Sequence, residues 1–346
     1  WIKSKSIAEH LFAPLSRRLI SRHHLQVLGG TLVRRVNLSP DSQRVSSVEL
    51  MNVATKSVQV IDDVDAVVLA VGAKGLKSLM AQSPELSNAA PELVSAASLG
   101  SIDVVSARLW LDRYVPIAYP ANVFSRFESL KGSGGTFFML DQLHKDAQQA
   151  LWGDEQPQGS VVASDFYNAS AIAAMSDQEI IDLLKRELLP IAHLEFTNAR
   201  VVDSEVRRYP GSVSLFSPGS FRKRPPLETS VESIVCAGDW VRMGDKEHGA
   251  KGLCQERAYV CGLEAGNSLI RRKIVNGAGH SHPVLPIRTD EPQVVLGRAL
   301  NKLVMDPIEA LGLKLPWFNI AASARLFSIA SPHGDPRRRN PAAPPD

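Results

Sequence analysis

The sequence lacks the glycine-rich signatures with which many proteins hold nucleotides. Neither G-x-G-x-x-G nor G-x-x-x-x-G-K-[ST] occurs in its 346 residues. Gly132, Gly134 and Gly135 lie close together, but no strand–helix pattern surrounds them, so we interpret this stretch as a plain turn. No glycine-rich loop in this chain therefore indicates a dinucleotide or a nucleoside triphosphate.

Other absences exclude further classes of function. The net charge is only +3, which gives no indication of nucleic-acid binding. Cys236, Cys254 and Cys261 show neither C-x-x-C spacing nor a disulfide framework, which favours a reducing compartment. Cys254 and Cys261 fall on one predicted helix, and we interpret them as packing residues. No histidine cluster has metal-site spacing, and no apolar run is long enough to predict a membrane span. The chain begins at Trp1 without a visible leader, so we expect it to be the back portion of a longer protein.

Periodicity predicts a mixture of helices and strands. Residues 5–22 have the four-residue apolar spacing of an amphipathic helix. The continuously apolar segment 65–72 predicts a strand buried on both faces, followed by a helix. Ser176 and Glu179 form a capping box that opens a helix ending near Leu189. Further strands are expected over 27–48 (two or three strands), 57–61, 100–112, 160–166 and 198–208, the last followed by a turn at Tyr209-Pro210-Gly211.

The most informative segment is 233–257. A short apolar run ends in Gly238-Asp239, and Gly249-Ala250 opens a helical pattern about ten residues later. The carboxylate can accept hydrogen bonds from ribityl hydroxyls, and a helix start offers free N–H groups to a pyrophosphate or to the electron-rich edge of a flavin. The charged cluster 245–248 between them is either a solvated loop or a wall of an active site, and both interpretations remain open.

Three separated segments resemble, in the family's order, the carboxyl-terminal portion of flavin-dependent amine oxidases and phytoene (carotenoid) desaturases. They are VLGGTLVRRV (27–36), DAVVLAVGAKGLKSLM (65–80) and AGDW with HGAKGL (237–253). The resemblance extends over roughly residues 5–272. Each motif is weak alone, whereas the ordered set is fairly specific.

The resemblance implies an α/β fold. It consists of a Rossmann-like FAD-binding domain, incomplete in this chain, with an inserted α+β substrate domain built on a mixed sheet. The implied division is 1–80 for part of the FAD-binding domain and linker strands, 81–230 for the substrate-binding domain, 231–275 for the closing FAD-binding segment, 276–330 for a C-terminal helical extension and 331–346 for a disordered tail.

The same resemblance implies FAD as the cofactor. The backbone of Val33 would meet the adenine, and Gly238 and Asp239 would touch the ribityl–phosphate part. The residues implied to bind the cofactor are Val33, Val71, Gly72, Gly238, Asp239, Trp240, Gly249 and Ala250.

Departures from the family pattern bear on the substrate. Amine oxidases often carry an aromatic residue where this chain has Lys246, and a cation there would repel an ammonium group and offer it no ring. His248 replaces the usual acidic residue, with Glu247 one position earlier. The sequence indicates no definite general base, and Lys246, Glu247 and His248 are the weak catalytic candidates. These departures favour desaturase-like chemistry.

The expected activity is hydride transfer from an apolar isoprenoid-type small molecule to flavin. Two alternatives stay open: an amine oxidase-like flavoenzyme, and a non-catalytic binding protein that retains the fold. No nucleic-acid partner and no metal are expected. The apolar segment 294–318 is compatible with a peripheral membrane contact, although packing on the protein's own core is favoured. A plastid or cytoplasmic location, with or without membrane association, is suggested only by the resemblance.

Overall fold

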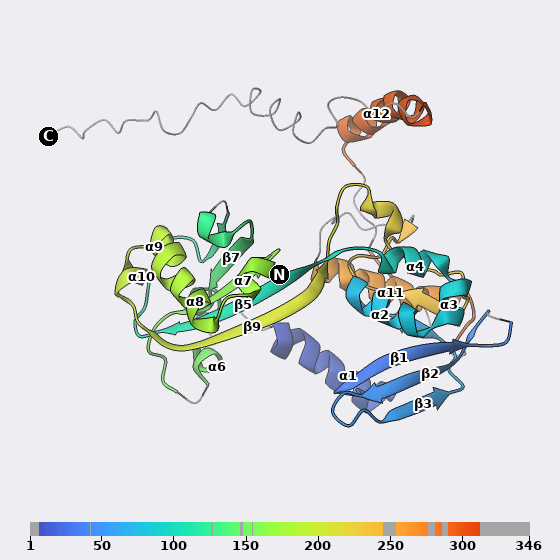
Figure 1. Ribbon diagram of the computed structural model, residues 1–346, viewed down its shortest axis with the longest axis horizontal. Helices are drawn as coiled ribbons and strands as arrows, with labels where there is room; N and C mark the ends of the chain where they lie inside the picture. Colours follow the sequence, from blue (N-terminus) through green and yellow to red (C-terminus); the bar gives the residue numbers. More distant parts are fainter. Residues whose placement is uncertain are drawn as a thin grey trace. The chain divides into compact units, whose positions relative to one another are not determined.

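The computed structural model describes residues 7–41, 43–125, 127–145, 148–153, 155–244, 254–275, 281–285 and 290–311. The chain divides into two units, Trp1–Leu285 and Pro286–Asp346 (Figure 1). The described part of the second unit contains helix α12 (Pro292–Ala310). Among the described residues, no helix is both long and apolar enough to cross a bilayer. The finer domain boundaries expected from the sequence stay a prediction.

A small parallel sheet lies at the centre of one hydrophobic core. Strand β4 (Val67–Leu69) pairs in parallel with β10 (Ile234–Cys236). The apolar faces of the surrounding helices pack around these strands in a single cluster. The helices are α2 (Ala73–Gln82), α3 (Pro84–Ala89), α4 (Pro91–Ala97) and α11 (Gln255–Arg271).

The strand predicted over 65–72 is shorter than expected, and the prediction that both its faces are buried is wrong. Leu69 is 6% exposed, but the neighbouring Val68 is 44% exposed. Successive side chains of a strand point to opposite faces. Only one face of β4 is therefore covered by the core of the described residues, although the whole run is apolar.

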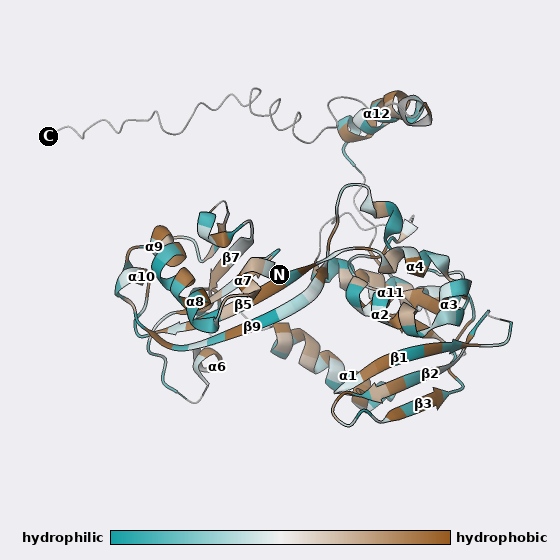
Figure 2. Ribbon diagram, in the orientation of Figure 1, coloured by the Kyte–Doolittle hydropathy of each residue, from teal (hydrophilic) through white to brown (hydrophobic). Residues whose placement is uncertain are grey.

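The expected strands between 27 and 61 form an antiparallel sheet of β1 (Thr31–Leu38), β2 (Val45–Asn52) and β3 (Val58–Asp62). Ser233 joins this sheet to the central one. Its hydroxyl accepts a hydrogen bond from Val45 N–H at 2.7 Å, and its carbonyl accepts one from Val67 N–H at 2.8 Å. Figure 2 shows hydrophobic residues along β1 and β3, part of which stay exposed.

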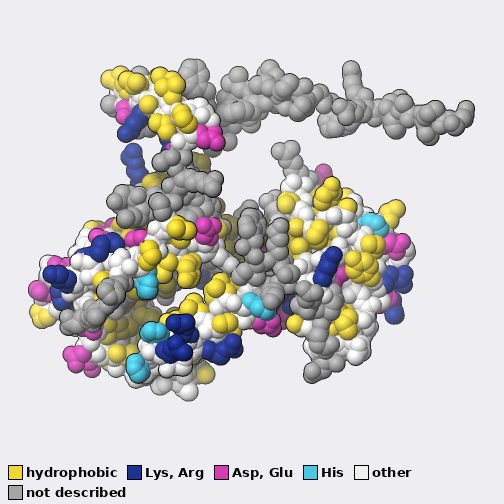
Figure 3. Space-filling model, turned by 180° about the vertical axis from the view of Figure 1, so that it is seen from behind, with side chains coloured by type: hydrophobic (Ala, Val, Ile, Leu, Met, Phe, Trp, Pro, Cys, Tyr) yellow, Lys and Arg dark blue, Asp and Glu magenta, His cyan; other side chains and the backbone are white. Residues whose placement is uncertain are grey.

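The amphipathic helix predicted at the start of the chain is confirmed. A π-helical turn (Ala8–Phe12) continues into α1 (Ala13–His23), so Pro14 lies within a continuous helical path and its missing N–H removes one intrahelical hydrogen bond. Phe12 and Ile20 are exposed, as are the arginines of α1. Figure 3 shows basic, histidine and hydrophobic side chains gathered on the face seen from behind.

A larger sheet in the order β6-β7-β8-β5-β9 has its own core. Its strands are β5 (Ser101–Leu111), β6 (Ala121–Phe124), β7 (Gly134–Met139), β8 (Val161–Tyr167) and β9 (Val201–Ser214). We expected a mixed sheet, but all its described pairings are antiparallel. Hairpin-like returns such as β6 to β7 leave neighbouring strands in opposite directions.

Short helices cover one face of this sheet (Figure 1). Inward side chains such as Val105 and Leu109 alternate along β5 with the more exposed Ser106 and Arg108. The opposite face therefore carries the second set of side chains. The covering helices are α7 (Ser170–Ala173), α8 (Asp177–Asp182), the π-helical segment Leu183–Leu188, α9 (Leu189–Ala192) and α10 (Glu195–Asn198). Two further short helices, α5 (Leu140–Leu143) and α6 (Gln148–Trp152), contribute no described side chain to this core.

Two predicted turns are instead parts of strands. Tyr209-Pro210-Gly211 lies inside β9, where the pairing register shifts opposite Ile102/Val104 and Gly211 has φ +62°. A bulge-like irregularity accommodates a proline and a left-handed glycine without ending the strand. Gly134 and Gly135 begin β7, and only Gly132 lies in the turn before it.

Candidate functional site

The predicted cofactor-binding residues after β4 and β10 lie at one edge of the central sheet. The register pairs Ile234 with Val67 and Cys236 with Leu69, so both strands end together. Ala237 N–H extends the pairing by donating to Leu69 O at 3.0 Å. Val71-Gly72 and Gly238–Trp240 therefore leave the sheet at its carboxyl edge, the edge where ligands bind in parallel α/β sheets.

Gly72 forms the N-cap of α2 and leaves the start of that helix open. Its backbone is extended, with φ −76° and ψ 177°, and a Cβ added there would meet no atom within 4 Å. The first turn of a helix has N–H groups without intrahelical partners and a positive dipole end. The start of α2 can therefore receive an anionic group without a side chain in the way.

Gly238 begins a tight turn that only glycine adopts easily. Its φ is +129°, and an added Cβ would lie 3.1 Å from Trp240 Cδ1. Trp240 itself is 4% exposed and belongs to the central core. Its indole therefore anchors the turn, and a cofactor contact by this residue would involve its backbone.

Asp239 places a carboxylate between the end of β10 and the start of α11. Burial raises the pKa of its carboxyl group. Hydrogen bonds from its own N–H and from Cys254 N–H, and the charges of Arg224 and Arg257, act in the opposite direction but do not outweigh burial. A carboxylate has about four acceptor positions, so these two N–H groups leave capacity for further donors. The predicted hydrogen bonds to ribityl hydroxyls remain a prediction.

Two buried arginines hold the backbone of residues 239–241 through hydrogen bonds. Arg257 is fully buried; its Nε donates to Asp239 O and its Nη2 to Val241 O, both at 2.7 Å. Arg224 donates through Nε to Trp240 O at 2.5 Å and through Nη2 to Asp239 O at 3.0 Å. Its guanidinium also lies 4.5 Å from the Phe216 ring centroid. Three successive carbonyl groups are thus held by two cations.

This arrangement places two guanidinium charges next to the carboxyl edge. Guanidinium groups remain charged throughout the physiological pH range, and burial strengthens their field. Sequence reasoning missed both arginines. A signal existed for Arg257, because it shares the inward spacing of Cys261, Ala265 and Ser268 on α11.

Cys261 packs in the central core, as predicted, and so does Cys236, whereas Cys254, for which packing was also predicted, caps a helix. Burial raises the pKa of the Cys236 thiol to about 12, which keeps it protonated. Cys261 lies opposite it on α11, with Sγ 3.9 Å from Cys236 O. Cys254 is the N-cap of the same helix, and its sulfur accepts a hydrogen bond from Arg257 N–H.

The structure places the other predicted site residues less completely. Val33 lies on β1, just before a register shift, is 45% exposed, and its strand packs against α2. Lys246, Glu247, His248, Gly249 and Ala250 lie outside the described residues. The two interpretations of the 245–248 cluster therefore stay open.

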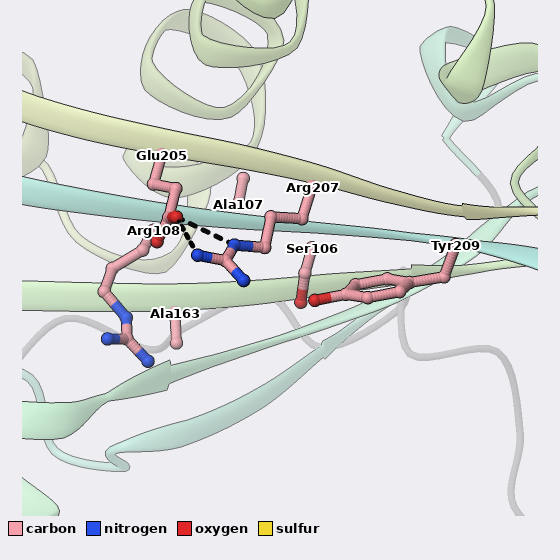
Figure 4. A pocket seen from close by; sticks show the side chains of 7 residues that line it. All are labelled: Ser106, Ala107, Arg108, Ala163, Glu205, Arg207 and Tyr209. Carbon is pink, nitrogen blue, oxygen red and sulfur yellow. Dashed lines mark hydrogen bonds and ion pairs between the residues drawn. The ribbon is translucent and has the colours of Figure 1, made fainter. Parts of the chain in front are cut away.

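A second candidate site is a hollow of about 320 Å³ on the larger sheet (Figure 4). It lies on the face away from the helices and spans β5, β8 and β9. Charged and hydroxyl groups dominate it. Its lining residues are Ser106, Ala107, Arg108, Ala163, Glu205, Arg207 and Tyr209.

Comparison with known proteins assigns the family. Residues 7–249 match the model of the flavin-containing amine oxidoreductases. The chain belongs to this family. Membership confirms the superfamily predicted from the three segments, and it implies a flavin cofactor.

Among relatives of this family member are two carotenoid phi-ring synthases. The protein from Streptomyces griseus is 29% identical over 62% of this chain and 38% of its own length. The one from Chlorobaculum tepidum is 28% identical over 59% of this chain and 30% of its own length. The chain thus spans about a third of the curated relatives it matches.

Solved structures give a weaker likeness. An oxidoreductase from Methanosarcina mazei superposes with a TM-score of 0.40 at 11% identity, over 72% of this chain and 51% of that one. A putative protoporphyrinogen oxidase from Exiguobacterium gives 0.38 at 14% identity, over 69% and 47%. Scores of this size do not define a shared fold.

Proposed function

We propose that the full-length protein is an FAD-dependent oxidoreductase that removes hydride from an apolar isoprenoid-type substrate, as carotenoid desaturases do. The observation that carries the proposal is the carboxyl edge of the β4–β10 sheet. There Asp239 is held by two buried arginines beside the open start of α2. The isoprenoid part is supported by the names of the two carotenoid-modifying relatives.

The residues at this edge suit FAD chemically. The free acceptor capacity of Asp239 fits ribityl hydroxyls, and the open start of α2 fits a pyrophosphate. The buried Arg224 and Arg257 support this site by fixing the backbone of residues 239–241. Bound flavin would supply the hydride acceptor. The chain's own part is to bind and orient the ligands and to exclude water.

The test is the flavin content of the full-length protein with Asp239→Ala. We expect the variant to lose FAD, seen as loss of the flavin absorption band, while the exposed Asp203→Ala variant keeps it. Stoichiometric FAD and normal turnover in Asp239→Ala would contradict the assignment of Asp239. A protein that binds flavin but releases peroxide with polyamines would instead be an amine oxidase.

A peripheral membrane contact is a further part of the proposal, since isoprenoid substrates dissolve in lipid. On α12, Leu296, Leu300 and Leu303 follow helical spacing and are 55–72% exposed. Arg298 and Lys302 fall on the other side of the helix. This amphipathic pattern supports binding to a membrane surface, and packing against protein remains the competing explanation.

A further inference from the structure

The open face of the five-stranded sheet carries a row of side chains whose character changes along it. The registers place Glu205, Arg108, Ala163, Phe138 and Ala121 side by side across β9, β5, β8, β7 and β6. The row is charged at β9 and β5, small at β8, and apolar at β7 and β6. Three strand spacings, from β5 to β6, span roughly 14 Å.

The charged end coincides with the hollow of Figure 4. Arg207 Nε and Nη2 both donate to Glu205 Oε1, at 2.7 and 2.5 Å. One guanidinium of the hollow is therefore already neutralised. Ser106 and Tyr209 line the same hollow, and the Ser106 hydroxyl donates to Asp165, which lies two residues along β8 from Ala163.

Arg108, unlike Arg207, has no carboxylate partner among the described residues. Its guanidinium lies 5.7 Å from the Trp110 ring centroid. Its neighbour across the strand pair is Ala163, whose methyl group leaves space. The hollow thus offers one exposed guanidinium with unused donors, flanked by hydroxyl groups, at one end of an increasingly apolar row.

We propose that this face binds the anionic end of an isoprenoid-type ligand, a carboxylate or a phosphate, at Arg108. Its apolar chain would cross Ala163 toward Phe138. A guanidinium is suited to both oxyanions because its donors form a planar fork. The isoprenoid character rests on the proposed function, whereas the oxyanion rests on the hollow itself.

The binding of all-trans-retinoate to the full-length protein tests this proposal, with all-trans-retinol as the uncharged match. Trp110 lies beside Arg108, and the part of the tryptophan fluorescence quenching that is lost in Trp110→Phe is the local readout, since the chain has 5 tryptophans. We expect Arg108→Gln to weaken retinoate binding by about tenfold, the loss of one charge-assisted contact, and to leave retinol binding unchanged. Glu205→Gln should tighten retinoate binding, because it removes the negative charge of the hollow.

Arg186→Gln is the matched control, since Arg186 is an exposed arginine outside the hollow; it should bind retinoate like the wild type. Competition by geranylgeranyl diphosphate distinguishes the two oxyanions: displacement of retinoate supports a phosphate end, and retinoate binding without displacement supports a carboxylate end. Equal retinoate binding by wild type and Arg108→Gln, or none by either, would overturn the inference. Flavin content is measured on the same samples, so that loss of flavin with intact retinoate binding counts against the proposed function alone.

Discussion

Asp239 is a carboxylate that the folded protein stabilises incompletely. Burial raises its pKa above the ordinary 3.8, so folding favours its protonated form. That contribution to stability is complete below about pH 3.8 and is lost as pH rises through the raised pKa. An asparagine side chain at this position cannot ionise. We therefore expect flavin-free Asp239→Asn to gain stability relative to wild type over that window, measured by urea unfolding at several pH values.

The control for this prediction is Asp203→Asn at an exposed position of β9. Its difference from wild type should stay flat over the same pH range. If the stability difference between Asp239→Asn and wild type also stayed constant with pH, the carboxylate would be no better solvated in the unfolded chain than in the folded protein. A gain in stability together with a loss of flavin would show that this residue is kept for binding.

Replacing Arg257 should lower the stability of the protein, whereas replacing Asp239 should raise it. Replacement of Arg257 by Met leaves the buried carbonyl of Val241 without its guanidinium donor, whereas the carbonyl of Asp239 keeps the one from Arg224. An unsatisfied buried carbonyl costs about 1–3 kcal/mol, so we expect urea unfolding to show a loss of roughly 1–3 kcal/mol. Arg186→Met, at an arginine whose side chain is 76% exposed, should change stability by less than about 0.5 kcal/mol. A similar small effect for both variants would contradict the structural role of Arg257.

At this scale the sequence predicts part of the site. Gly238 and Asp239 were found because a strand ending in Gly-Asp is a local pattern, and Gly238 has the φ that such a turn requires. Arg224 and Arg257 were missed because an arginine is buried only when the folded chain brings carbonyl groups to it. Their partners lie 15 to 18 residues away in the sequence.

Among the elements, the start of α8 is the clearest local prediction. Ser176 Oγ accepts from Glu179 N–H at 3.3 Å, and Glu179 Oε2 accepts from Ser176 N–H at 2.7 Å, which confirms the predicted capping box. Ser176→Ala should destabilise the protein by about 1 kcal/mol.

The pH dependence of this effect separates the capping box from a general packing defect. Hydrogen bonds from Ser176 lower the pKa of Glu179 below its ordinary 4.5. The carboxylate's contribution is therefore present above about pH 4.5 and is lost as pH falls through the lowered pKa. Thermal unfolding should show the difference between Ser176→Ala and wild type shrinking in acid. An unchanged difference would mean that Glu179 takes no part.

Elements that depend on distant partners were predicted less well. The apolar run 65–72 indicated a strand, but Val68 is exposed because burial of a strand face depends on what covers it. Tyr209-Pro210-Gly211 has turn composition, and pairing with β5 nevertheless keeps it in β9. The order β6-β7-β8-β5-β9 also joins strands far apart in sequence, and no local pattern encodes such pairings.

For the whole molecule, the two hydrophobic cores lie entirely within the first unit. Their members run from Val36 to Ile274, and none comes from the second unit. Removing residues 286–346 therefore deletes no described core side chain. We expect the shortened chain to unfold at the same urea concentration as the full chain, within the roughly 0.5 kcal/mol typical of surface changes. A large loss would mean that the second unit contributes to the fold.

The same shortened chain tests whether α12 serves a membrane surface. The exposed leucines of α12 can be buried either in lipid or against protein, and the two alternatives give opposite results. If α12 inserts into the interface, the full chain should co-sediment with phosphatidylcholine–phosphatidylglycerol liposomes and the shortened chain should not. Leu300→Asp together with Leu303→Asp should abolish sedimentation in the same way, while Lys302→Gln on the polar side should have little effect. Equal sedimentation of the full and shortened chains would exclude α12 as the membrane contact and leave packing against protein as the role of its apolar side.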